Sequence, residues 1–113
     1  MPVLARTIEA AGIATVVVTM MPYWSSLCGV PRTLGVEFPF GQPFGMPKDD
    51  AGQREVLRAA LDLLENASPG MIVAWDRPWP QPVEEARRTW HPPDPSPLIA
   101  YWLQQPDNPL RPR

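Results

Sequence analysis

The sequence predicts a small three-layer α/β unit with a mainly parallel sheet of about three strands, followed by a proline-rich extended arm. Two observations indicate the sheet: a helix–glycine–strand pattern opens the chain, and a long helix separates two later strand-like runs. A third observation indicates the arm, because most of the 17 prolines lie from Pro69 onward. A chain of 113 residues has room for one core. We therefore expect an α/β domain at 1–76 and an arm at 77–113.

The start of the chain predicts a helix and then a strand. Residues Val3 to Ala11 place Leu4 and Ile8 on one face, and Gly12 follows where a left-handed C-cap is needed. The β-branched run Ile13 to Thr19 lacks polar alternation, which is typical of a strand covered on both faces.

A second strand is predicted at Thr33 to Phe38. The segment Met20 to Arg32 between the two strands is interpreted as a crossover with one helical turn. The segment Pro39 to Pro47 alternates rings, prolines and glycines, so we expect a loop there. A third short strand is predicted at Met71 to Trp75.

The longest helix is predicted to begin at Asp50, because Gln53 follows at the spacing of a capping box. Ser68-Pro69-Gly70 ends it. Its apolar face has two adjacent stripes. They are Val56, Ala60, Leu63 and Ala67, and Leu57, Leu61 and Leu64.

Composition argues against several classes of function. The formal charge of −2 provides no broad positive surface, so we expect neither nucleic acid nor a membrane surface as partner. The apolar run Ile13 to Met21 is too short to cross a bilayer, and the first residues lack a secretion signal. The expected location is the cytoplasm. A single cysteine, Cys28, and a single histidine, His91, give no disulfide and no metal-ligand spacing, and no cofactor is expected.

The loop after the second strand is the predicted substrate site. It follows a parallel strand and precedes a helix, which is where open α/β sheets bind ligands. Glycine amides beside the helix N-terminus favour a small anionic substrate. A rigid turn that packs its own rings is the alternative. The residues assigned to this site are Arg32, Phe40, Gly41, Phe44 and Gly45.

Arg32 and Glu37 flank or lie in the second strand. If that strand is central, one of them must be paired, although a surface arginine and an edge glutamate are the simpler interpretation. Cys28 is the candidate catalytic thiol, with an inert buried thiol as the alternative. We interpret His91 as a stacked surface ring rather than a catalyst.

Four aromatic residues of the arm are assigned to partner binding, since their burial would offset the entropy of ordering a proline-rich segment. They could cover the chain's own domain or a neighbour's, and we expect a homo- or hetero-oligomer. The four are Trp79, Trp90, Tyr101 and Trp102.

Several of these segments resemble the selenoprotein B family of glycine, sarcosine, betaine and D-proline reductases. The resemblance runs from about residue 2 to 75, and Trp90-His91-Pro92-Pro93 shows a weaker similarity. Ala14 stands where the family commonly has proline. The similar segments are Val3-Leu4-Ala5-Arg6, Ile8-Glu9-Ala10-Ala11-Gly12-Ile13, Thr15-Val16, Pro31-Arg32, Phe38-Pro39-Phe40-Gly41, Pro43-Phe44-Gly45, Pro47, Gln53-Arg54, Val56-Leu57 and Ala59-Ala60-Leu61.

The resemblance implies reductive cleavage of C–N bonds in small amines and amino acids. It places the family's redox selenocysteine or cysteine upstream of the first helix, and Cys28 does not fall on that position. We therefore expect a subunit that binds substrate while another chain supplies the reactive group. The alternative is a non-catalytic assembly protein whose aromatic arm wraps a partner enzyme.

Overall fold

A computed structural model describes residues 1–89 and 96–105, which form two compact units, Met1–Pro82 and Val83–Arg113. The first unit extends to Pro82 rather than to residue 76. Trp90 and His91 lie outside the described residues. Within the part that the structure describes, no helix is both long enough and apolar enough to cross a membrane.

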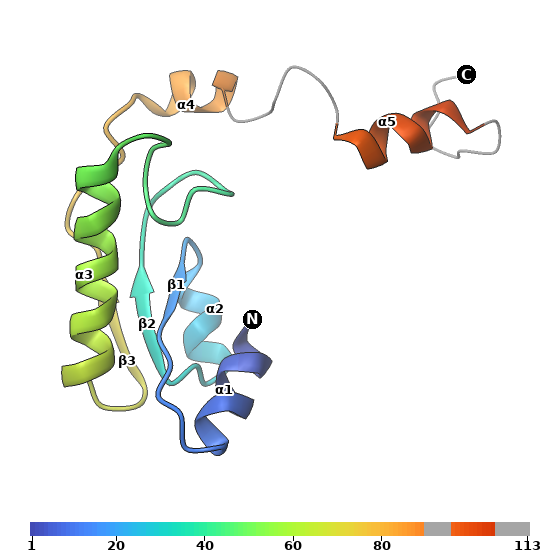
Figure 1. Cartoon of the computed structure of the whole chain (residues 1–113). Helices are drawn as coiled ribbons and strands as arrows, with labels where there is room; N and C mark the ends of the chain where they lie inside the picture. The colour runs from blue at the N-terminus through green and yellow to red at the C-terminus, as the bar shows by residue number, and fades with distance from the viewer. Residues whose placement is uncertain (90–95, 106–113) are drawn as a thin grey trace. The chain divides into compact units, whose positions relative to one another are not determined.

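The sheet of the first unit is wholly parallel. Its strands are β1 (Val17–Thr19), β2 (Arg32–Gly35) and β3 (Met71–Ala74), in the spatial order β1-β2-β3 (Figure 1). Thr33 of β2 is opposite Val17 on one side and Ile72 on the other. The predicted parallel α/β fold is confirmed.

Helices cover both faces of the central strand β2. On one face, Leu34 and Val36 pack against α3 (Asp50–Asn66) to form the core, and both are 1% exposed. On the other face, Gly35 lies so close to Pro22 of α2 (Pro22–Leu27) that an added Cβ would be 2.9 Å from the Pro22 Cβ. Successive residues of a strand point to opposite faces, so α3 and α2 lie in separate layers. The three-layer prediction and the helical turn in the crossover are confirmed.

The first helix, α1 (Pro2–Ala10), ends as its sequence predicts. Gly12 has φ 86°, a conformation that costs glycine little. Its N–H donates to the Glu9 carbonyl at 2.9 Å, and the Ile13 N–H donates to the Ile8 carbonyl at 3.3 Å. These two bonds form a Schellman motif, which turns the chain toward β1.

The first two strands differ in extent from the prediction. Only Val17–Thr19 of the run Ile13 to Thr19 pairs, because Thr15 directs its N–H and hydroxyl to the Glu9 carboxylate instead of to a strand. β1 is an edge strand that is only half-buried, so the prediction that it is covered on both faces is wrong. β2 begins at Arg32 and ends at Gly35, which leaves Glu37 and Phe38 in the following segment.

The N-terminus of α3 is capped by Asp49, so the predicted capping box at Asp50 is wrong. The Asp49 Oδ1 atom accepts from the Gly52 N–H at 3.1 Å. Gln53 instead donates from Nε2 to the Met46 carbonyl at 2.6 Å, which ties the loop to the helix. One apolar stripe of α3 is confirmed as core: Val56, Ala60 and Ala67 are buried, and Leu63 packs against them.

The second unit contains α4 (Val83–Thr89) and α5 (Pro97–Gln104), so the arm is not extended throughout as predicted. Proline is tolerated in the first helical turn, where its missing N–H would have no partner. Pro97 occupies that place, and the Ser96 hydroxyl caps the helix by accepting from the Ile99 N–H. The proline-free residues that follow Pro82 and Pro97 leave room for each helix.

Candidate functional site

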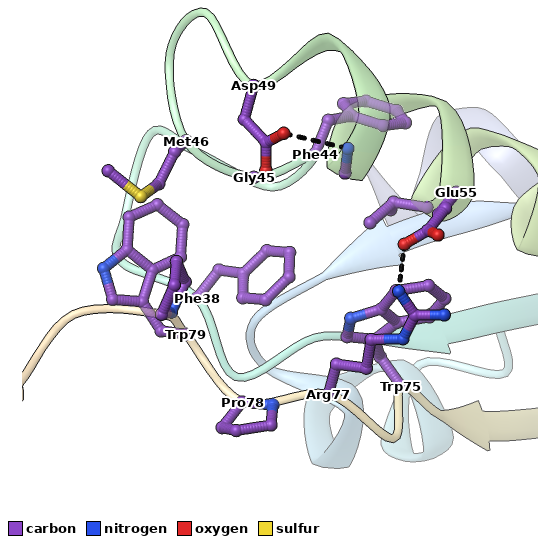
Figure 2. Close-up of a pocket in the computed structure, with 13 residues that line it drawn as sticks. Phe38, Phe44, Gly45, Met46, Asp49, Glu55, Trp75, Arg77, Pro78 and Trp79 are labelled. Carbon is purple, nitrogen blue, oxygen red and sulfur yellow. Dashed lines mark hydrogen bonds and ion pairs between the residues drawn. The ribbon is translucent and has the colours of Figure 1, made fainter.

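A cavity of about 170 Å³ lies beyond the carboxyl ends of β2 and β3 (Figure 2). Parallel strands that end side by side bring their following loops together, and α/β sheets commonly bind ligands there. Phe38 comes from the segment after β2, and Asp49 and Glu55 come from the start of α3. The segment after β3 contributes Trp75 and the run Arg77 to Pro80. The site belongs entirely to the first unit.

Aromatic rings form the walls of this cavity. Phe38 packs edge-on against Trp79, with ring centroids 5.3 Å apart and planes at 63°. Figure 2 shows the Phe38 ring between Trp79 and Trp75. Trp75 also packs against the core cluster, which fixes its indole. The walls are therefore held by the body of the domain.

The cavity has three charged lining residues, and Figure 2 shows Asp49 apart from the Glu55–Arg77 pair. The Arg77 guanidinium forms an ion pair with Glu55 and stands 5.7 Å from the centroid of the Trp75 ring. Both members of this pair reach solvent, with side chains 61% and 42% exposed. Asp49 is the other carboxylate, and it is held by the Gly52 N–H. Two carboxylates and one guanidinium give these lining residues a net charge of −1.

The lining of the cavity offers a limited set of polar side chains. Among the described lining residues there is no cysteine, serine, threonine, histidine or lysine. No cluster of three or more His, Cys, Asp or Glu residues with metal-binding geometry occurs within residues 1–89 and 96–105. The ionisable groups of the lining are the Asp49 and Glu55 carboxylates and the Arg77 guanidinium.

The loop predicted to hold the substrate is only partly in the site. Phe44 and Gly45 line the cavity, whereas Phe40 and Gly41 do not. Two successive turns shape the loop: Gln42 N–H donates to the Pro39 carbonyl and Gly45 N–H donates to the Gln42 carbonyl, each at 3.1 Å. Gly41 and Gly45 have φ of 85° and 116°, so the turns depend on glycine.

Arg32 is far from the loop in the topology, because it starts β2 and the loop follows the other end of that strand. Its Nη1 donates to Glu9 Oε1 at 2.7 Å and its Nε donates to the Ala67 carbonyl at 2.9 Å. The side chain is 11% exposed. The simpler interpretation, a surface arginine and an edge glutamate, is thus wrong. β2 is the central strand, Arg32 is paired as the alternative required, and Glu37 is exposed in the segment that follows β2.

The carboxyl of Glu9, the partner of Arg32, has a lowered pKa. The Thr15 backbone N–H, at 2.5 Å, is the main group that holds the pKa of Glu9 below its ordinary value. The Thr15 hydroxyl and the Arg32 guanidinium act in the same direction, and partial desolvation opposes them. This cluster joins α1, β2 and the end of α3, so its role is structural.

Cys28 does not reach the cavity. It is the half-buried C-cap residue of α2, where its N–H donates to the Trp24 carbonyl at 3.0 Å.

Of the four aromatic residues assigned to a partner, Trp79 packs within the first unit. Tyr101 and Trp102 lie on α5 and are 60% and 56% exposed. Trp90 lies outside the described residues.

Sequence reasoning missed most of the lining residues, among them the charged and indole side chains of Asp49, Glu55, Trp75 and Arg77. A signal for two of them was present, because Trp75 and Arg77 directly follow the third strand. Loops after adjacent parallel strands share one edge of the sheet, so that segment belonged with the loop after the second strand.

The chain matches no protein-family model, no curated protein and no solved structure.

Proposed function

We propose that this chain is a cytoplasmic substrate-binding component of a multi-subunit reductase-like enzyme, and that its cavity holds a small zwitterionic amine such as an amino acid. One observation carries the proposal. A cavity of about 170 Å³ at the carboxyl ends of two parallel strands has aromatic walls and a carboxylate–guanidinium pair in its lining. A cavity of about 150 Å³ accommodates benzene, so this volume suits an amino acid and is too small for a nucleotide.

The two ends of a zwitterion match the two kinds of charge at the site. An ammonium group is attracted to indole faces and to a carboxylate, as the Arg77 guanidinium already is by Trp75 and Glu55. A ligand carboxylate would pair with Arg77. The net charge of −1 disfavours a ligand that is only an anion, so the proposed substrate carries a cationic group as well.

The resemblance to selenoprotein B reductases supports the same substrate class. Those enzymes cleave C–N bonds with a redox selenol or thiol, and this cavity has no thiol among its described lining residues. In the proposal, a partner subunit presents the reactive group, and Cys28 takes no part in the redox step. The chain's own task is to hold the amine and exclude water.

Binding is tested by titrating the full chain with proline and glycine betaine while recording ¹H–¹⁵N spectra of the tryptophan indoles. Both ligands should shift the Trp75 and Trp79 signals, and acetate at equal ionic strength should not. Glu55→Gln and Arg77→Gln should each weaken binding by about tenfold, the effect of losing one charged pair. Arg58→Gln and Glu65→Gln on α3 are the matched controls. Equal shifts with acetate, or none at millimolar ligand, would refute the proposal.

An assembly role is the second candidate, and α5 is the observation that favours it. Every described residue of this helix is at least partly exposed, and Leu98, Tyr101 and Trp102 are 66%, 60% and 56% exposed. A helix that is apolar around its circumference normally lies against other protein. Purification from the native source followed by native mass spectrometry tests this role. Leu98→Ser with Tyr101→Ser should release the partner while the indole shifts of the cavity persist.

A further inference from the structure

β3 has the sequence of a buried strand but lies at the surface of the first unit. Met71, Ile72, Val73 and Ala74 are all exposed, the first three at 44%, 39% and 37%. Parallel strands with such uninterrupted apolar sequences are normally covered. Among residues 1–89 and 96–105, β2 is the only strand that pairs with β3, so the backbone groups on the other side of β3 form an open edge of the described sheet.

Apart from its short length of four residues, β3 has none of the sequence features that usually prevent strand pairing at an edge. Natural edge strands are protected by lysine, proline, bulges or very short length, because an open edge pairs readily with another strand. Met71–Ala74 contains no charged residue and no proline. Its register with β2 runs without interruption from Arg32↔Met71 to Gly35↔Ala74, so no bulge bends it away.

We propose that β3 pairs antiparallel with β3 of a second copy of this chain, which joins the two three-stranded sheets into one. The absence of charge favours a second copy as the occupant. In an isologous pair a residue on the two-fold axis faces its own copy and residues beside the axis lie near it, and like charges opposite one another are destabilising. An uncharged strand can therefore approach itself without repulsion.

The hydrogen bonds between β3 and β2 show which backbone groups of β3 point to the open edge, and the proposed register uses those groups. The Trp75 N–H donates to the Gly35 carbonyl of β2 at 2.7 Å, so by alternation the N–H groups of Ile72 and Ala74 point to the open edge. A two-fold axis through Val73 sets Ile72 opposite Ala74 of the second copy, and each such pair exchanges two backbone hydrogen bonds. A large side chain then faces a small one.

Val73 lies on this axis as a non-hydrogen-bonded pair with its twin, where side chains approach most closely. Two β-branched residues suit that position. A single short strand from each copy buries less than a standard interface of about 1,600 Å², so the dissociation constant should be on the order of micromolar or weaker. This inference is independent of the ligand proposed for the cavity.

The first test is sedimentation of the full chain over a concentration series, with reductant present to exclude cross-linking through Cys28. We expect a monomer–dimer equilibrium. Hydrogen exchange at high concentration should slow the Ile72 and Ala74 amides specifically. A monomer at all concentrations, with both amides exchanging freely, would overturn the proposal, and so would a dimer in which they remain unprotected.

The second test uses the axis position. Val73→Lys and Val73→Glu should each raise the dimer dissociation constant by about tenfold or more, because identical charges then meet. An equimolar mixture of the two variants should restore dimerisation, since lysine then faces glutamate. Circular dichroism confirms that each variant is folded. Ile13→Lys, at another exposed apolar residue, should dimerise like the parent. A mixture of folded variants that stays monomeric would contradict the two-fold register.

Discussion

Arg32 and Glu9 form a partly buried ion pair, 2.7 Å between Nη1 and Oε1, that joins the start of β2 to the end of α1. The same arginine reaches the last turn of α3 through the Ala67 carbonyl. Three segments that meet at the amino end of the sheet are thus held by one side chain.

Arg32→Met should therefore destabilise the fold without touching the cavity directly. The substitution keeps much of the apolar stem but removes both hydrogen bonds, and a bond to a charged group contributes about 1.5–3 kcal/mol. We expect the free energy of unfolding in urea to fall by about that amount. Arg58→Met, on the exposed side of α3, is the control and should change it by less than about 0.5 kcal/mol.

The Glu9 carboxyl makes the stability depend on pH. Its folded-state pKa lies below the ordinary value of 4.5, so near that pH the unfolded chain binds more protons than the folded one. The contribution of Glu9 is fully present above about pH 4.5 and is lost as the pH falls through the lower, folded-state pKa. Urea midpoints measured from pH 7 to pH 3 should show this decline. Glu9→Gln should reduce it, and Glu65→Gln should leave it as in the parent.

The close contact between Gly35 and Pro22 predicts that a larger residue at position 35 destabilises the fold and that a smaller residue at position 22 restores part of the lost stability. A Cβ at residue 35 would lie 2.9 Å from the Pro22 Cβ, closer than packed carbons approach. Gly35→Ala should cost about 1–3 kcal/mol of unfolding free energy, as overpacking does. Pro22→Ala in the same chain retains the clashing Cβ but removes the ring, so it should recover part of the loss. A double-mutant cycle without coupling would contradict this contact.

Local patterns predicted the elements better than they predicted the contacts between them. The Gly12 cap, the parallel order and the Val56–Ala60 stripe depend on neighbours in sequence or on general rules of topology, and all are confirmed. The Glu9–Arg32 pair joins residues 23 positions apart, and no spacing rule indicates it. The charged pair of the cavity was missed for the same reason. This Glu55–Arg77 pair spans 22 positions and forms only when α3 packs against the sheet.

The two adjacent aspartates at the start of α3 show how one residue can decide a cap. Asp49 accepts from the Gly52 N–H. Asp50 lies inside the first turn, where its negative charge interacts favourably with the helix dipole. Asp49→Ala should lower the unfolding free energy by about 1 kcal/mol, and Asp50→Ala by about 0.5 kcal/mol or less. Paired urea denaturation of the two variants measures the difference. Because Asp49 also lines the cavity, its loss should weaken proline binding as well, and Asp50→Ala should not. The reverse order of stabilities would place the cap at Asp50.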